Sequence, residues 1–125
     1  MSILSTLKRA FIVSALLFLG FGTAAAAQSL QFETDYVHLD VVTGQPETVY
    51  IEVINTGQYQ VAIQHIKTNP RYTKMVYYPQ LLFPGHYDEL EFTFTAHSPG
   101  FHSSLIRVYD SSGGQRIIQI DAQAQ

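Results

Sequence analysis

Apolar and polar residues alternate with a period of two along most of the chain after residue 28. The clearest case is Val49–Val53, in which valine, isoleucine and valine alternate with tyrosine and glutamate. Successive side chains of a strand point to opposite faces, so this pattern predicts a half-buried β-strand. Asn55 and Gly57 follow, and both residue types tolerate the positive φ of a tight turn. We therefore expect the strand to end there and the chain to reverse.

The same alternation predicts further strands, and turns rich in glycine and proline separate them. Ser111–Gly114 in particular is a strong hairpin signal. No segment after residue 28 shows a helical period. Many short strands at spacings of about ten residues predict an all-β chain, an immunoglobulin-like β-sandwich of about seven or eight strands. The further strands are expected at residues 30–32, 37–41, 61–66, 75–78, 90–94, 101–109 and 117–120.

Two of these strands carry more specific expectations. Val61, Ile63 and then His65 are expected on one face, with Ile66 on the other. This strand either forms a hairpin with the strand before it or crosses to a second sheet. At the end of the chain, the polar tail 123–125 is expected to fray.

The N-terminal segment has a different character from the rest. Lys8 and Arg9 precede an apolar run, Ala10–Phe21, and small residues follow it. This order is typical of a secretory signal peptide, and the run is shorter than the roughly 20 residues of a membrane-spanning helix. We expect cleavage after Ala27, which leaves 28–125 as one domain in the periplasm or outside the cell. No stable membrane insertion is expected after cleavage.

Composition and charge narrow the classes of function. The chain has no cysteine, so it has no disulfide, no lipidated cysteine and no thiolate metal site, and packing must hold the domain. Ten acidic residues stand against seven basic ones, and Lys8 and Arg9 belong to the expected signal peptide. A negative domain argues against a nucleic-acid partner bound through its phosphates. No cofactor is expected.

The order of several short motifs resembles a known family. The motifs are Val49–Gly57, Val61–Ile66, Phe83–Gly85, Leu90–Phe94 and Pro99–Ile120. Together they resemble the immunoglobulin-like domains of the ASPM/SPD-2/Hydin type, and among these the bacterial exported proteins grouped as a DUF1573-like family. The resemblance implies a sandwich that serves as an interaction module.

The chain departs from that family at two places. Bacterial members often carry a Cys-x-Cys pair where this chain has Asn69–Arg71, so a redox or metal role tied to that pair is not implied. The family also tends to have an aromatic residue where this chain has His102. A one-residue bulge would return the neighbouring Phe101 to the core.

A second resemblance is to the PapD-type fimbrial chaperones. Tyr78–Gly85 is similar to their subunit-binding strand. Those chaperones have two domains and basic residues that clamp a carboxylate, whereas this chain has residues for one domain. The resemblance implies a PapD-like periplasmic chaperone module as an alternative function.

Histidines are the main candidates for chemistry. Neutral imidazole is a good ligand for copper or zinc, and His97 and His102 flank a turn where His86 could join them. The competing interpretation is scattered surface histidines, with His102 partly buried and hydrogen-bonded, and we favour it. The five histidines are His38, His65, His86, His97 and His102.

Serine and acidic residues give weaker candidates for catalysis. A nucleophilic triad of Ser103 or Ser104 with His102 and Asp110 is disfavoured, because neighbouring strand residues point to opposite faces. The acidic residues from Asp88 to Glu91 are expected to form a solvated face. We expect no enzymatic activity.

One basic and aromatic cluster remains as a candidate binding site. Tyrosine and arginine are enriched at protein interfaces, and loops on a rigid sandwich often carry binding residues. We expect a module that binds another protein of the cell envelope, through this cluster or by strand addition at a sheet edge. The alternative is an ordinary edge whose tyrosines cover the core. The cluster comprises Arg71, Tyr72, Lys74, Tyr77 and Tyr78.

Overall fold

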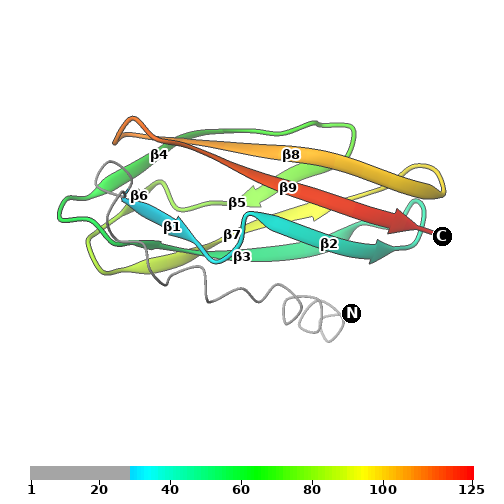
Figure 1. Ribbon diagram of the computed structural model, residues 1–125, viewed down its shortest axis with the longest axis horizontal. Helices are drawn as coiled ribbons and strands as arrows, with labels where there is room; N and C mark the ends of the chain where they lie inside the picture. The colour runs from blue at the N-terminus through cyan, green and yellow to red at the C-terminus, as the bar shows by residue number, and fades with distance from the viewer. Residues whose placement is uncertain (1–28) are drawn as a thin grey trace.

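The computed structural model describes residues 29–125 and shows two packed β-sheets made of nine strands (Figure 1). One sheet has the order β1-β3-β7-β5 and the other β2-β9-β8-β4-β6. The all-β sandwich is confirmed, and the strand beyond the expected eight is the two-residue β6. The strands are β1 (Leu30–Phe32), β2 (Tyr36–Val41), β3 (Glu47–Asn55), β4 (Val61–Lys67), β5 (Thr73–Tyr77), β6 (Leu81–Leu82), β7 (Tyr87–Phe94), β8 (Gly100–Asp110) and β9 (Gln115–Ala124).

The expected signal peptide and its cleavage site lie outside the described residues. Within residues 29–125, no helix is long and apolar enough to cross a membrane.

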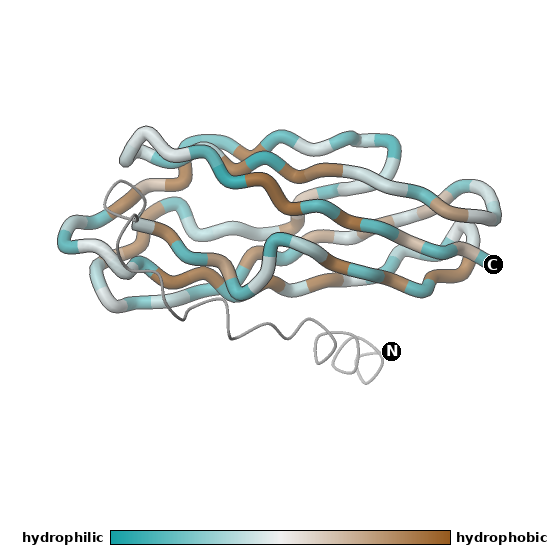
Figure 2. The backbone as a smooth tube through the Cα atoms, viewed as in Figure 1, coloured by the Kyte–Doolittle hydropathy of each residue, from teal (hydrophilic) through white to brown (hydrophobic). Residues whose placement is uncertain are grey.

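The core lies between the two sheets, where the inward positions of the strands meet. Hydrophobic and hydrophilic residues alternate along the strands (Figure 2). In the central pair of the first sheet, Val49 lies opposite Phe92 and Ile51 opposite Leu90, and all four side chains are fully buried. Apolar burial of this kind is the main stabilising contribution in a domain without disulfides.

The chain crosses to the second sheet after β3 and does not form a hairpin. β4 pairs with β8, which decides between the two alternatives left open by the sequence. The expected positive φ at Asn55 and Gly57 is wrong, because positive φ occurs among the described residues only at Gly44, Gly85, Gly100 and Gly113.

Asn55 ends β3 for a different reason. Its side chain is fully buried and donates to the carbonyl oxygens of Tyr59 and Leu82, each at 2.8 Å. Its Oδ1 accepts from the backbone N–H of Gly57, also at 2.8 Å. A Cβ at Gly57 would lie 2.7 Å from Oγ of Ser29, so any other residue here would force Ser29 to move. The carboxamide therefore holds the corner by hydrogen bonds.

A β-bulge in β4 changes the faces that the sequence predicts. The pairing with β8 shifts between Ile63 and His65, so the alternation reverses beyond this point. Ile66 packs against the core, whereas His65 is exposed and contacts the ring of Tyr109 edge-on. The prediction that His65 follows Ile63 inward is wrong.

Two further expectations about strands are wrong. β8 pairs with β9 without a bulge, so Phe101 is 61% exposed and the half-buried His102 takes the inward position. The tail does not fray, because the backbone of Gln125 donates to Val41 and accepts from Thr43. In both cases the long β8–β9 pairing extends to the end of the chain.

The first and fifth strands both lie at sheet edges. β1 lies at one edge of the first sheet and β5 at the other, while β2 and β6 are the edges of the second sheet. β2 runs parallel to β9. The segment Tyr78–Gln80 connects β5 in one sheet to β6 in the other, so it closes this side of the sandwich.

Candidate interaction surface on strands β5 and β6

In the structure, some residues of the predicted basic and aromatic cluster pack against the core and the others are exposed. Tyr72 and Tyr78 are half-buried and pack against the core. Arg71, Lys74 and Tyr77 are exposed. Of the five residues, these three are therefore the most open to a partner, and binding by the cluster stays a prediction.

Tyr72 has a clear structural role. Its ring stacks on the buried Phe94, with centroids 5.5 Å apart and an interplanar angle of 4°. Its hydroxyl bonds to Nδ1 of His102 at 3.2 Å. Tyr72 thus closes the end of the core, and its removal would disturb the fold before it disturbed a partner.

The histidines near this end fasten neighbouring loops together. Nε2 of His97 lies 3.1 Å from the Arg71 carbonyl oxygen, and Nε2 of His102 lies 2.8 Å from that of Ser98. His86 does not join them, because it lies in the turn before β7, at the other end of the sandwich. Within residues 29–125, no three His, Asp or Glu side chains are placed to hold a metal ion.

The two candidate catalytic serines do not contact His102 or Asp110 through the hydrogen bonds that a catalytic triad needs. Ser103 donates to Asp121 at 2.7 Å, and the buried Ser104 hydroxyl has no hydrogen-bond partner within residues 29–125. The carboxylate of Asp110 accepts from the turn residue Ser112 and so stabilises the β8–β9 hairpin. These contacts do not form a chain from a serine through His102 to Asp110.

At the start of β5, the backbone groups on the outer edge already have hydrogen-bond partners. Bonded and non-bonded pairs alternate in an antiparallel ladder, and the N–H of Thr95 bonds to Tyr72. The backbone of Thr73 must then point outward, where its N–H donates to Asn69 and its carbonyl accepts from Thr68. By the same alternation, the N–H and carbonyl of Met75 face outward.

A bulge follows directly after Met75. Met75 pairs with Phe92 and Tyr77 with Glu91, which leaves Val76 as the extra residue. Val76 is 53% exposed and Tyr77 46% exposed. The Tyr77 hydroxyl donates to Oδ2 of Asp88 at 2.7 Å, and this hydrogen bond raises the pKa of the phenol. The bulge prevents a long regular strand from adding to this edge.

An open depression lies beside the bulge. It has a volume of about 360 Å³ and is lined by Met75–Tyr78 and Gln80. The side chain of Leu81, the next residue along the chain, is 45% exposed. We call this region, formed by Met75–Tyr78, Gln80 and Leu81, the β5–β6 surface.

Sequence reasoning found only part of the β5–β6 surface. It named Tyr77 and Tyr78 as binding residues but not Val76. Gln80 and Leu81 entered only through the resemblance of Tyr78–Gly85 to a subunit-binding strand. Met75–Tyr78 is a run without alternation, and Pro79 follows it. Such a break in the period is the one local signal of a bulged edge.

Comparisons with known proteins identify the fold. No family model and no curated protein matches the chain. The ASH/PapD-like domain 7 of human CEP192 matches with a TM-score of 0.69 at 11% identity, over 86% of this chain and 93% of that one. A protein of unknown function from Porphyromonas gingivalis W83 matches with a TM-score of 0.68 at 18% identity, over 83% of this chain and 51% of that one.

A nematode domain extends the same likeness. SSP-19, an MSP-domain protein of Caenorhabditis elegans, matches with a TM-score of 0.57 at 16% identity, over 69% of this chain and 94% of that one. The chain thus has the immunoglobulin-like sandwich fold shared by ASH, PapD-like and MSP-type domains. A fold of this breadth carries no particular activity, so function must be argued from surfaces.

Proposed function

We propose that the protein is a non-enzymatic interaction module of the cell envelope that binds another protein through the β5–β6 surface. The observation that carries this proposal is the exposure of Val76 and Tyr77, which line an open depression at the edge strand β5. The exposed Leu81 follows the lining residue Gln80 in the chain. Covering such exposed apolar side chains with a partner protein is favourable, because it removes apolar surface from water.

Export and family membership are part of the same proposal. Lys8 and Arg9 before the run Ala10–Phe21 support a cleaved signal peptide, and hence a periplasmic or secreted protein. The motif order supports a place near the DUF1573-like branch of the ASH-type domains. Mass spectrometry of the protein purified from cells tests the first point, and a first residue of Gln28 is the expected result.

Recognition would depend on side chains more than on strand addition. Thr73 already has partners for its outward backbone groups, and the bulge at Val76 ends the regular edge. Met75 alone offers an outward N–H and carbonyl between them. A partner would therefore make one or two backbone hydrogen bonds and insert an apolar side chain into the depression.

Site-specific photo-crosslinking tests the proposed surface. A photoreactive amino acid at Gln80 should give one defined adduct in the native envelope. The same residue at Val42, which is 53% exposed at the other end of the molecule, should not. Adding Val76→Ser and Leu81→Ser to the Gln80 variant should abolish the adduct. No adduct at Gln80, or equal adducts at both positions, would overturn the proposal.

Tyr72 should not be part of that test. Its stacking on Phe94 means that Tyr72→Ala would lose the partner through loss of structure. Lys74→Ala is a better probe of the basic flank, because Lys74 is exposed on β5. We expect Lys74→Ala to weaken the adduct less than the double apolar substitution does.

A further inference from the structure

Two cations lie directly opposite each other on the outer face of the second sheet. In the β4–β8 ladder, Lys67 pairs with Arg107. Paired residues point to the same face, and Ile106 and Val108 on either side of Arg107 are buried in the core, so both cations point outward. Lys67 is exposed and Arg107 is half-buried. Because like charges directly opposite in a sheet are destabilising, this arrangement does not serve the stability of the fold.

No acidic side chain within residues 29–125 neutralises these two residues, which we call the cation pair. Neither Lys67 nor Arg107 makes an ion pair or a side-chain hydrogen bond in this part of the chain. None of their neighbours in the ladder is acidic. These neighbours are His65, Leu105, Tyr109 and Ile117. Two positive charges therefore lie together on a sheet face without a counterion from the described residues.

The acidic residues of the same strands already have hydrogen-bond donors. Strands β4, β8 and β9 contain two of them, Asp110 and Asp121. Asp110 is buried, and its carboxylate accepts from the N–H of Ser112 at 2.8 Å. The carboxylate of Asp121 accepts from the hydroxyl of Tyr36 at 2.8 Å and from that of Ser103 at 2.7 Å. Neither carboxylate is therefore the partner of the cation pair.

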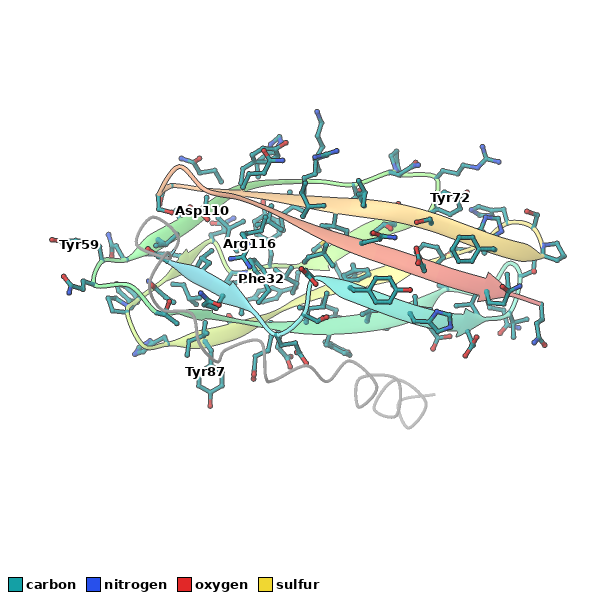
Figure 3. The ribbon with its side chains drawn as sticks, in the orientation of Figure 1. Phe32, Tyr59, Tyr72, Tyr87, Asp110 and Arg116 are labelled. Atoms are coloured by element: carbon teal, nitrogen blue, oxygen red, sulfur yellow. The ribbon has the colours of Figure 1, made fainter. Side chains whose placement is uncertain are left out.

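Arg116 provides a contrast within the same sheet. It precedes Ile117 in β9 but lies beside Phe32 of the first sheet (Figure 3). Its Nη1 donates to the Leu30 carbonyl oxygen at 2.8 Å, and its guanidinium carbon lies 5.6 Å from the centroid of the Phe32 ring. Arg107 has no such contacts within residues 29–125, so its N–H donors are available to a ligand.

The chemistry of the cation pair fits a phosphate group. A guanidinium binds phosphate through two parallel hydrogen bonds, and an ammonium adds a point charge. A phosphate monoester carries a charge of about −1.5 to −2 near neutral pH, which matches the two positive charges, whereas a carboxylate would neutralise one of them. Ile117 is 43% exposed and Leu105 39%, and both adjoin Arg107 on the same face. An apolar substituent on the phosphate would cover these two side chains.

We propose that Lys67 and Arg107 form a binding site for a phosphate monoester on the outer face of the second sheet. The phosphate lies between the ammonium and the guanidinium, and its organic substituent covers Ile117 and Leu105. A soluble ester and the headgroup of phosphatidic acid both offer this group, and the experiment separates the two sources. This inference does not depend on the partner site on β5 and β6.

The test is an NMR titration of the nitrogen-labelled protein with phenyl phosphate, near neutral pH and at constant ionic strength. We expect saturable shifts of the side-chain Nε–H of Arg107 and of the backbone amides of Lys67 and Arg107. Inorganic phosphate should bind about threefold more weakly, because it leaves Ile117 and Leu105 uncovered. Benzoate, which keeps the ring but carries a single charge, should bind about tenfold more weakly.

Variants assign the binding to the cation pair. Lys67→Gln and Arg107→Gln should each weaken binding of phenyl phosphate by about tenfold. Lys74→Gln removes the same charge from an exposed position of β5 in the other sheet and should leave binding unchanged. The urea midpoint of Lys67→Gln should stay equal or rise, because the repulsion between the two cations is relieved. Loss of binding in this variant is then not loss of the fold.

Vesicles identify the source of the phosphate. Cosedimentation with phosphatidic acid vesicles that is lost in Arg107→Gln assigns the site to a lipid headgroup, whereas binding of phenyl phosphate without cosedimentation assigns it to a soluble ester. The proposal is overturned if phenyl phosphate gives no saturable shifts, or if benzoate binds equally well. Binding that survives both substitutions, or that falls equally in Lys74→Gln, overturns it as well.

Discussion

Replacing Asn55 by alanine should lower the free energy of unfolding by roughly 2–5 kcal/mol. The substitution leaves the buried Leu82 carbonyl without its donor, which costs about 1–3 kcal/mol. The bonds to Tyr59 and Gly57 are partly buried, so water can replace them, and each contributes about 0.5–1 kcal/mol. Small domains are stable by about 5–15 kcal/mol, so this one carboxamide accounts for a large share.

Urea unfolding measures this loss directly. The chain has eight tyrosines and no tryptophan, so tyrosine fluorescence and far-UV circular dichroism are the probes. The urea midpoint should fall while the m-value stays the same, because the surface exposed on unfolding is nearly unchanged. Hydrogen exchange at Gly57 should quicken, since its N–H loses the acceptor Oδ1.

Two neighbouring variants sharpen the result. Thr56→Ala removes only the exposed bond from Oγ1 to Ser29 and should cost less than about 0.5 kcal/mol. Asn55→Asp keeps an acceptor for Gly57 but loses both donors and buries a charge, so it should destabilise at least as much as alanine at neutral pH. If Asn55→Ala costs under about 1 kcal/mol, or no more than Thr56→Ala, the reasoning is refuted.

Three further predictions follow from other contacts. Ser104→Ala removes a buried hydroxyl without a partner in the described part of the chain, so the free energy of unfolding measured in urea should stay equal or rise by up to about 1 kcal/mol; a clear loss would contradict this. Tyr72→Phe keeps the ring on Phe94 and should cost about 0.5–1.5 kcal/mol, whereas Tyr72→Ala should cost at least twice as much in the same assay. Hydrogen bonds, first of all from Ser103, hold the pKa of Asp121 below its ordinary value of 3.8. Its stabilising contribution is therefore present above that value and lost as pH falls through the lower, folded-state pKa, and NMR titration of Ser103→Ala should show the pKa moving back up.

The strands could be predicted because their signal is local. In β3 and β7 every second residue enters the core, so the period of two is complete and the ends near Asn55 and Phe94 were found closely. The sequence could not predict which residues of β4 face the core, because the bulge in β4 depends on pairing with Asp110 and Tyr109, which lie far along the chain. The inward position suggested for Phe101 was wrong for the same kind of reason, because continuous pairing with β9 fixes its outward position.

The candidate surface was predicted as a region but not residue by residue. The segment from Arg71 to Tyr78 does lie at a sheet edge, as its broken pattern suggested. Tyr72 became a core residue only through Phe94 and His102, which are distant in sequence. Leu81 was not predicted to lie in a strand, because a two-residue strand has no period to detect.

The Asn55 corner and the β5–β6 surface meet at β6. Leu81 belongs to the β5–β6 surface, while the carbonyl of its neighbour Leu82 accepts a hydrogen bond from the Asn55 side chain. β5 runs toward the same end of the sandwich, because it lies antiparallel to β7, which begins with Tyr87. Loss of the Asn55 carboxamide would therefore disturb the proposed partner site as well as the corner, and the crosslink from Gln80 should weaken in Asn55→Ala.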